Sequence, residues 1–575
     1  MERGIGTSRG IGIGHVLIVY NASAVVNRGT HYNAEEEKKR FFEARKTFIE
    51  QTEELLSELE KKLGESDKDA LVLKNQIYLA KDITTENEVV VAIDNSHICA
   101  EAAFDDVCNK LIQLFSSMDN PDMQQRVTDI QDMRERMIQI LQGTKAFDLT
   151  NLPDNTVIVA DEIKPSMTAS MDIAHVAGIV AEKGGDTAHA SILARALEIP
   201  AVLSVKGILQ KVKNGDSIII DGAYGEVFIN PTQRTFSIYE KKKKKYEEHI
   251  EELKTFINKS TETADGKKVM LAANIGGADE AAKAIKAGAE GVGLFRTEFL
   301  FLNKSALPTE EEQFEEYKKA AVLTKGMPLT IRTLDIGGDK DIPYMGLTKE
   351  TNPFLGYRAI RFCLDRVDIF TTQLRAILRA SAYGSIRIMI PMITSVNEVR
   401  QVKDMIKKIC SDLDHNGISY DKNIQIGVMI ETPAAAIMAD AIAQEVDFFS
   451  IGTNDLTQYT IAVDRCNENV AYLYSAFNPA VLRLIRRIIE CAHNAGIEAG
   501  MCGEAAANAL MAPILLSFGL DEFSVSTGKV LETRKTIADW SLKEAGLVTD
   551  KVMSMATEKE VTDYLSDYLS ERNKK

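Results

Sequence analysis

Apolar, strand-like runs alternate with amphipathic helical runs throughout residues 261–575. Eight strand-like runs occur there, and a helical pattern separates each from the next. Eight successive βα units are typical of a TIM barrel, which we therefore predict for this part of the chain. A doubly wound open sheet is the alternative, but it predicts a Gly-rich nucleotide-binding turn after the first strand, and Gly276-Gly277-Ala278 matches that turn poorly. The expected strands cover residues 269–275, 291–295, 329–334, 386–392, 424–430, 448–451, 498–501 and 522–525.

Charged or reactive side chains follow five of these expected strands. The active sites of TIM barrels form at the carboxyl ends of the strands, so side chains at those positions come together in the fold. Arg296 and Arg332 stand at the ends of the second and third strands, and Arg465 comes soon after the sixth. One such residue could be an ordinary surface charge, but five strands that carry them at the same end favour a functional site. The three guanidinium groups suit a phosphate and a carboxylate.

Two carboxylates and a thiol complete this group of candidate site residues. Glu431 follows the fifth strand and Asp455 the sixth, and Mg²⁺ prefers one or two carboxylates together with substrate oxygens. Cys502 follows the seventh strand, where a thiol could move a proton or act as a nucleophile. These residue types predict a small substrate with a phosphate and a carboxylate, whose conversion needs one protonation step.

A second candidate site lies at residues 184–195, which read GGDTAHASILAR. A strand-like run at 179–182 leads into the Gly-Gly turn, and a helical pattern with His189 in its first turn begins at once. Asp186 or Thr187 can serve as the N-cap. The free backbone N–H groups and positive end of this helix would hold a phosphoryl group on the imidazole and favour a neutral ring near pH 7. The alternative is a helix-capping loop that carries His189 incidentally.

The first half of the chain predicts a helical segment inserted into an α/β domain. Residues 10–20 look like strands and residues 33–143 are helical in pattern, including a stretch over 68–93. Short strands return after Pro153, and the first strand is expected to pair with them. Glutamates directly follow the lysine run at 241–245, which favours a solvated linker helix over a nucleic-acid site. The predicted parts are an α/β domain (1–30 and 146–230), a helical subdomain (31–145), a linker helix (231–260) and the barrel (261–575).

The composition predicts a soluble, cytoplasmic protein. Hydrophobic residues make up 45% of the chain and charged residues 26%. The formal net charge of −16 argues against non-specific binding of nucleic acid and requires any anion site to be locally basic. The seven cysteines have no paired spacing, which indicates reduced thiols. We expect no membrane insertion, because no apolar run approaches the length that spans a bilayer.

Several motifs closely resemble those of the phosphoenolpyruvate-protein phosphotransferases, the Enzyme I family of the bacterial sugar phosphotransferase system. The resemblance covers essentially the whole chain and the order of its domains, and together the motifs are highly specific. The matching motifs are GLFRTEFL (293–300), LPTEEEQ (307–313), DIGGDK (335–340), NPFLGYR (352–358) and DFFSIGTNDLTQY (447–459).

This resemblance implies a C-terminal TIM barrel and an N-terminal α/β phosphohistidine (swivelling) domain with an inserted helical subdomain that binds the carrier protein HPr. It implies that phosphoenolpyruvate phosphorylates His189, which then passes the phosphoryl group to a histidine of HPr. It also implies Cys502 as the proton donor to the enolpyruvate carbon, Mg²⁺ as the cofactor on Glu431 and Asp455, and a homodimer that forms through the barrel. The implied substrate-binding residues are Arg296, Arg332, Asn454, Asp455 and Arg465, with Arg358 and Lys340 nearby.

The chain departs from the family pattern at three places, and one of them is the N-terminal signature Ser-Pro-Gly, which reads Ser8-Arg9-Gly10 here. The usual loop GGRTSH reads GGDTAH here, with Asp186 and Ala188 in place of an arginine and a serine. The carboxylate of Asp186 is expected either to repel the phosphate somewhat or to cap the helix. In the helices that dock HPr, where the family often has a histidine and acids, this chain has Gln76, Lys81 and Thr84, which predicts an altered carrier interface.

Two other functions compete with this interpretation. A pyruvate-phosphate dikinase or phosphoenolpyruvate synthase shares the phosphohistidine domain and the barrel but also carries a nucleotide-binding domain, for which this chain has neither a P-loop nor spare length. A catalytically silent regulator that binds a partner through the helices is the second alternative. The intact His189, Cys502, Glu431 and Asp455 argue against it.

Overall fold

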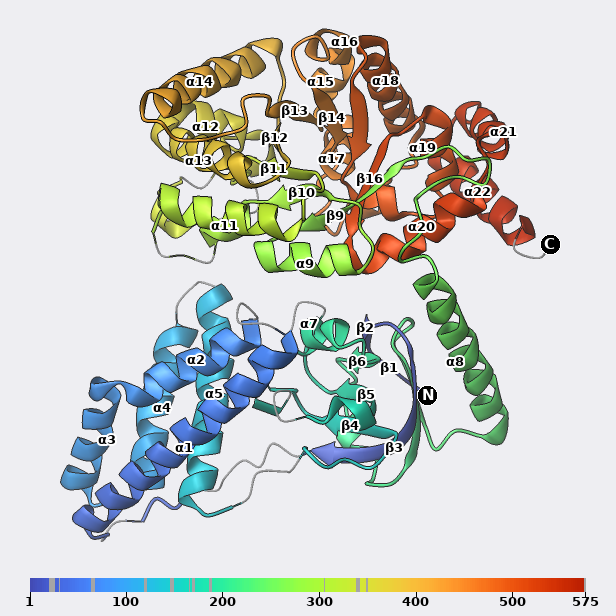
Figure 1. Cartoon of the computed structure of the whole chain (residues 1–575). Helices are drawn as coiled ribbons and strands as arrows, with labels where there is room; N and C mark the ends of the chain where they lie inside the picture. Colours follow the sequence, from blue (N-terminus) through green and yellow to red (C-terminus); the bar gives the residue numbers. More distant parts are fainter. Residues whose placement is uncertain are drawn as a thin grey trace. The chain divides into compact units, whose positions relative to one another are not determined.

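The computed structural model of the chain divides into two compact units, residues 1–250 and residues 251–575 (Figure 1). None of the helices in the described residues is both long enough and apolar enough to cross a membrane. The structure describes all residues except 20–25, 30–31, 64–67, 118–120, 145–148, 165, 168–170, 186–188, 303, 305, 338–341, 348–349 and 573–575.

The first unit contains a mixed sheet, which has eight strands within the described residues. The strands are β1 (Glu2–Arg3), β2 (Ile5–Ser8), β3 (Ile11–Val19), β4 (Thr156–Ala160), β5 (Val176–Ala181), β6 (Ala201–Leu203), β7 (Ser217–Asp221) and β8 (Glu226–Ile229), in the order β1-β8-β7-β3-β4-β5-β6-β2. The early strand β3 pairs with β4 in parallel and with β7 in antiparallel orientation, which confirms that it pairs with the later strands. Alternate residues of β4 pack in different apolar clusters, Val157 and Val159 in one and Ile158 and Ala160 in the other, because successive side chains point to opposite faces.

A group of helices interrupts the chain between β3 and β4 (Figure 1). Phe41, Phe48 and Phe104 lie in its apolar core, as helical spacing of the apolar residues predicts. The prediction of one helical stretch over 68–93 is wrong, because Asp82 interrupts it: its carboxylate accepts a hydrogen bond from the backbone N of Thr85 and caps a new helix. The helices are α1 (Ala34–Leu63), α2 (Lys68–Lys81), α3 (Ile83–Ser96), α4 (Ala100–Ser116) and α5 (Pro121–Leu141).

Two further helices follow in the chain. The short helix α7 (His189–Ala196) comes after β5, and its first residue is the histidine that the sequence singled out. The long polar helix α8 (Gln233–Lys254) contains the lysine run and crosses the boundary between the two units. Lys243 and Lys244 pair with Glu247 and Glu248 four residues on, at 3.9 and 3.8 Å, as on a solvated helix face.

The second unit is a closed barrel of parallel strands, which confirms the predicted TIM barrel and excludes the open sheet. The bounds of its strands differ from the expected runs by at most two residues. The strands are β9 (Met270–Ile275), β10 (Val292–Arg296), β11 (Leu329–Arg332), β12 (Ile386–Ile390), β13 (Gln425–Ile430), β14 (Phe448–Ile451), β15 (Glu498–Met501) and β16 (Glu522–Ser526). β16 pairs with β9 and closes the ring.

Helices surround the barrel strands, as Figure 1 shows. Most buried apolar residues of these strands and helices form one continuous core. The helices are α9 (Ala278–Lys286), α10 (Glu298–Leu302), α11 (Glu310–Leu323), α12 (Ile360–Asp365), α13 (Val367–Ala380), α14 (Val396–His415), α15 (Pro433–Ile437), α16 (Ala439–Ile442), α17 (Thr453–Ile461), α18 (Pro479–Ala495), α19 (Ala512–Phe518), α20 (Val530–Asp539), α21 (Leu542–Met553) and α22 (Glu558–Arg572).

Candidate active site

The closed barrel brings the residues at the strand ends to one mouth. Arg296 and Arg332 are the last residues of β10 and β11, and Glu431 directly follows β13. Asp455 lies in the first turn of α17, after β14, and Cys502 directly follows β15. Because all the strands are parallel, these carboxyl ends meet at the same end of the barrel.

Arg332 is buried between two carboxylates. Its Nη2 lies 2.5 Å from Glu298 Oε1 and its Nη1 lies 3.1 Å from Asp335 Oδ2. Burial alone would lower the pKa of this guanidinium, but Glu298 and Asp335 outweigh burial and raise it. Nε of Arg332 has no hydrogen-bond acceptor among the described residues, so one N–H of the group is still available.

Arg358 extends this row of alternating charges. Its Nη2 lies 2.9 Å from Asp335 Oδ1 and 3.1 Å from Asp455 Oδ2, and its Nη1 donates to Tyr459 Oη at 3.1 Å. Burial opposes the charge of Arg358, but Asp335 and Asp455 raise its pKa overall. Asp335 therefore bridges two buried guanidinium groups, and Asp455 reaches a third, because its Oδ1 lies 3.7 Å from Nη1 of Arg465.

Glu431 is a buried carboxylate beside this row. Its Oε1 accepts a hydrogen bond from the backbone N of Met392 at 2.6 Å. Burial, and then the nearby carboxylates of Asp455 and Asp335, raise the pKa of Glu431 to about 8. Its Oε2 lies over Gly452, where an added Cβ would approach to 2.7 Å, so only glycine leaves this oxygen its space.

Glu431 and Asp455 are the residues here that could hold a divalent cation. Oδ1 of Asp455 is buried and has no hydrogen-bond donor in the part of the chain that the structure describes. That part contains no group of three or more His, Cys, Asp or Glu side chains arranged to hold a metal. A cation would therefore need oxygens from a substrate or from water, which is how Mg²⁺ usually binds. The two carboxylates fit such a site.

Cys502 is buried in a small apolar cluster with Leu294, Met389, Met429 and Phe448. Its thiol donates a weak hydrogen bond to Ile451 O at 3.9 Å. Burial raises the pKa of the thiol to about 11, so it is a neutral acid at physiological pH. The backbone carbonyl of Cys502 accepts a hydrogen bond from Asn274 Nδ2 at 3.0 Å, which fixes the start of this loop.

The remaining predicted site residues are placed less tightly. Arg296 is exposed and forms no ion pair with any described residue. Asn454 contacts Glu504 through its side-chain amide, at 3.5 Å from Nδ2 to Oε1. Lys340 lies outside the described residues, as do Asp186 and Ala188 beside the histidine. For His189 the structure describes the backbone, at the start of α7, but not the side chain.

Glu298, Asp335 and Tyr459 belong to this group of buried contacts, although sequence reasoning gave them no role. Each stands within a motif that drew attention for another residue: Glu298 follows Arg296 by two positions and Asp335 follows Arg332 by three. For Glu298 and Asp335, the position shortly after a strand was a usable signal. Their pairing with guanidinium groups depends on the barrel geometry and could not be derived from spacing.

The residues expected at the carrier interface do not form one surface. Lys81 and Thr84 are exposed, but Gln76 is only 2% exposed. Its Nε2 donates to Asp132 Oδ2 at 3.1 Å, and its Oε1 accepts from Arg136 at 3.3 Å. Gln76 therefore cannot contact a docked partner without rearrangement. Lys81 pairs with Glu53 at 2.8 Å, which partly neutralises its charge.

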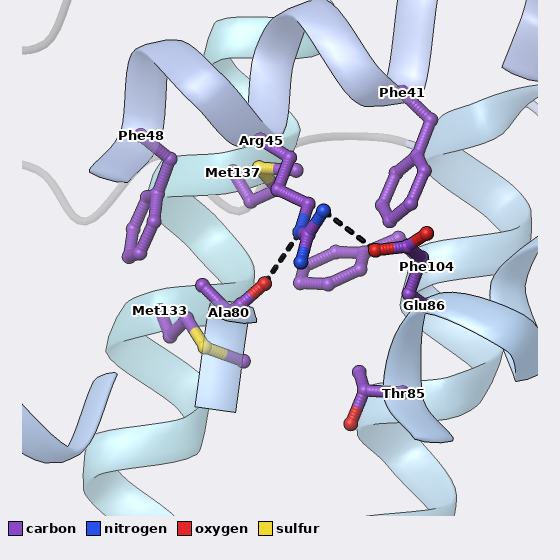
Figure 2. A pocket seen from close by; sticks show the side chains of 9 residues that line it. All are labelled: Phe41, Arg45, Phe48, Ala80, Thr85, Glu86, Phe104, Met133 and Met137. Atoms are coloured by element: carbon purple, nitrogen blue, oxygen red, sulfur yellow. Dashed lines mark hydrogen bonds and ion pairs between the residues drawn. The ribbon is translucent and has the colours of Figure 1, made fainter. Parts of the chain in front are cut away.

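A small cavity lies inside the helical group (Figure 2). Arg45 reaches across it, with Nε donating to Ala80 O at 2.5 Å and Nη1 2.6 Å from Glu86 Oε2. The cavity holds about 10 Å³, which is room for a single water at most, so it is a packing defect and not a ligand site. It is lined by Phe41, Arg45, Phe48, Ala80, Thr85, Glu86, Phe104, Met133 and Met137.

Comparison with known families matches three regions of the chain. Residues 250–542 match the PEP-binding domain of PEP-utilising enzymes, residues 152–225 match their mobile domain, and residues 3–126 match their N-terminal domain.

Curated relatives match nearly the full length. A phosphoenolpyruvate-protein phosphotransferase of Bacillus sp. (strain S) is 43% identical over 562 residues, which are 98% of this chain and 97% of that protein. The one from Geobacillus stearothermophilus has the same identity and coverage. The one from Bacillus subtilis (strain 168) is 41% identical over 565 residues, 98% of this chain and 99% of the relative.

Proposed function

The chain belongs to the phosphoenolpyruvate-protein phosphotransferase family, and we propose that it transfers the phosphoryl group of phosphoenolpyruvate to His189 and from there to a histidine of HPr. This would be the first step of the phosphoenolpyruvate-dependent sugar phosphotransferase system. The observation that supports it best is the row of buried, alternating guanidinium and carboxylate groups at the barrel mouth, from Glu298 through Arg332, Asp335 and Arg358 to Asp455. Such a row holds cationic groups rigidly where an anionic substrate binds.

We assign the anionic groups of the substrate to guanidinium groups that still have hydrogens to donate. Arg296 is exposed at the mouth, and Arg332 and Arg358 each keep an Nε–H without an acceptor among the described residues. Asn454 in α17 and Arg465 in the segment that follows this helix complete the set. By resemblance, Lys340 and Asp455 also contribute to this pocket.

Glu431 and Asp455 would hold Mg²⁺, as the buried Asp455 Oδ1 and the space above Gly452 suggest. When bound, the ion supplies charge neutralisation for the transferred phosphoryl oxygens. Carboxylates that crowd one another in a buried site lose mutual repulsion when a cation joins them. This agrees with the raised pKa of Glu431 in the protein alone.

The chemical step moves the phosphoryl group from the enol oxygen to an imidazole nitrogen of His189. The P–O bond to the enolate breaks while the P–N bond forms, and the enolate is left in the barrel. Its methylene carbon then takes a proton from the Cys502 thiol, which gives pyruvate and a thiolate that solvent reprotonates. A thiol with a pKa of about 11 is protonated before the step and suits a proton donor. Backbone N–H groups at the start of α7 would stabilise the phosphate on His189.

The partner and assembly proposals rest on the resemblance. HPr would dock on the helical subdomain of residues 31–145, and two chains would pair through their barrels. The acidic composition, with a formal net charge of −16, suits a basic carrier face. We propose a cytoplasmic location, where the substrate and carrier would be found.

Incubation with labelled phosphoenolpyruvate and Mg²⁺ without nucleotide tests this function against its two alternatives. Stable label on the protein, and its transfer to added HPr, is the expected result. A dikinase-like enzyme uses a nucleotide and not HPr as its phosphoryl partner, so it would transfer no label to HPr. A silent regulator would take no label, with or without HPr. Absence of label on the protein, or absence of its transfer to HPr, would refute the proposal.

A further inference from the structure

A buried glutamine lies behind the substrate-binding arginines, on the helix layer of the barrel. Gln373 in α13 is 0% exposed, and its side-chain amide makes three hydrogen bonds. Oε1 accepts from the backbone N of Leu334 at 2.9 Å. Nε2 donates to Thr297 Oγ1 at 3.1 Å and to Tyr317 Oη at 3.3 Å. The amide thus connects the chain segments that follow β10 and β11.

The hydrogen bonds around Gln373 have one consistent direction. Thr297, which accepts from Gln373, donates its own hydroxyl hydrogen to the backbone carbonyl of Arg332 at 2.8 Å. On the other side, Tyr317 donates to Gln313 at 3.2 Å. A threonine hydroxyl has a single hydrogen, so while Thr297 donates to the carbonyl of Arg332 it can only accept from Gln373. The side chain at this position must accept and donate at once, as an amide does at every pH.

These contacts fix the backbone on which the substrate-binding groups stand. Thr297 lies between Arg296 and Glu298, and Leu334 lies between Arg332 and the bridging Asp335. We propose that Gln373 is a positioning residue that sets the placement of Arg332 and Asp335 for phosphoenolpyruvate. The inference rests on the proposed function. Gln373 touches no substrate itself. It acts through the carbonyl of Arg332, by way of Thr297, and through the N–H of Leu334. A displacement near 1 Å at such groups is enough to change rates about 10²-fold.

Two variants separate the positioning role from mere core packing. Gln373→Met keeps the length of the side chain and removes all three hydrogen bonds. Gln373→Glu is a conservative variant, since a protonated carboxyl can accept from Leu334 and donate to Thr297 as the amide does. Burial raises the pKa of such a carboxyl above its ordinary value, so the protonated form dominates at low pH and is lost as the pH rises through that raised pKa.

Ser381→Ala is the matched control. Ser381 ends the same helix region, is 4% exposed, donates to Leu378 O at 2.6 Å and accepts from Asp421 N at 2.8 Å. It has no hydrogen bond to the strand ends that carry the arginines. Its loss therefore reproduces the removal of a buried polar group without the proposed effect on the site.

The experiment measures kcat and KM for phosphoenolpyruvate against pH in all variants, and the fluorescence of Trp540, the only tryptophan, during urea unfolding. We expect Gln373→Met to lower kcat/KM about 10²-fold, mainly through KM, and Ser381→Ala to lose stability with KM unchanged. Gln373→Glu should approach the unmutated protein at low pH and fall toward the Met variant at high pH. An unchanged KM in Gln373→Met would overturn the inference. So would a loss of activity in Ser381→Ala as large as that in Gln373→Met when the two variants are equally stable.

Crystal structures of the unmutated protein and of Gln373→Met test the positioning role without an activity measurement. The inference predicts that the contacts of Arg332 with Glu298 and Asp335 change in the variant. If they stay as they are, Gln373 only fills the core. If the unmutated protein takes no phosphoryl group from phosphoenolpyruvate, the proposed function fails, and these structures still test the positioning.

Discussion

Buried charges at the barrel mouth stabilise one another in pairs. Asp335 contacts Arg332 at 3.1 Å and Arg358 at 2.9 Å, and all three side chains are buried. Removing one member of a buried ion pair leaves its partner charged and desolvated, which typically costs about 3–5 kcal/mol, whereas an exposed pair is worth about 0–1 kcal/mol. The bridging position makes Asp335 the residue on which this row depends most.

We therefore expect Asp335→Asn to lower the free energy of unfolding of the barrel by about 3–5 kcal/mol and to weaken binding of phosphoenolpyruvate. Urea unfolding followed by the fluorescence of the buried Trp540 measures the first effect, because that residue lies in the barrel unit. Asp368→Asn is the control, since Asp368 pairs with Arg366 at 2.9 Å on the surface and should change stability by less than about 1 kcal/mol. Equal effects of the two substitutions would contradict the assignment.

Cys502 offers a second prediction for a single residue. Cys502→Ala should slow the formation of pyruvate about 10²–10⁴-fold and leave binding of phosphoenolpyruvate nearly unchanged, because a positioned acid contributes in the protonation step only. Single-turnover release of pyruvate and calorimetric binding measure the two effects. Cys502→Ser, which keeps the size but is a much weaker acid, should also be slow. If both variants release pyruvate at the original rate, Cys502 is a packing residue.

The helical subdomain shows how an element can differ from its sequence pattern. Apolar spacing correctly indicated helices through this region, but it did not reveal the break at Asp82 that separates α2 from α3. Nor did it show that Gln76 points inward, because a polar side chain on an amphipathic helix looks like a surface residue until its partners Asp132 and Arg136 are brought to it from α5. Of the residues predicted for the carrier surface, only the exposed Lys81 and Thr84 are left.

Lys81→Glu tests this surface. The substitution should increase the rate of phosphotransfer to a basic-faced HPr severalfold at low salt, and the increase should fade at high salt, because exposed charges at an interface act mainly on association. The gain is limited, since Lys81 is already paired with Glu53. Lys559→Glu makes the same charge change on the barrel unit, at a residue paired with Asp563. If Lys81→Glu and Lys559→Glu transfer the phosphoryl group to HPr at the same rate at both salt concentrations, Lys81 lies outside the interface.

For the whole molecule, the sequence predicted the fold better than it predicted the contacts. Strand bounds in the barrel follow from buried apolar runs, and the residues after those strands follow from the rule that such ends meet at one mouth. The bridging by Asp335 and the amide of Gln373 could not be predicted, because each joins segments that are far apart in the chain. His189 and the barrel residues belong to different units, so the proposed reaction requires the two units to meet.

The most direct test of the proposed reaction compares the unmutated protein with His189→Ala in the presence of phosphoenolpyruvate and Mg²⁺ and in the absence of nucleotide. Phosphorylation is followed by mass spectrometry of the intact chain and binding by calorimetry. We expect one phosphoryl group on the unmutated protein, none on His189→Ala, and the same affinity for phosphoenolpyruvate in both, because the binding groups lie in the barrel unit. Phosphorylation that persists in His189→Ala, or binding that is lost together with it, would contradict the account.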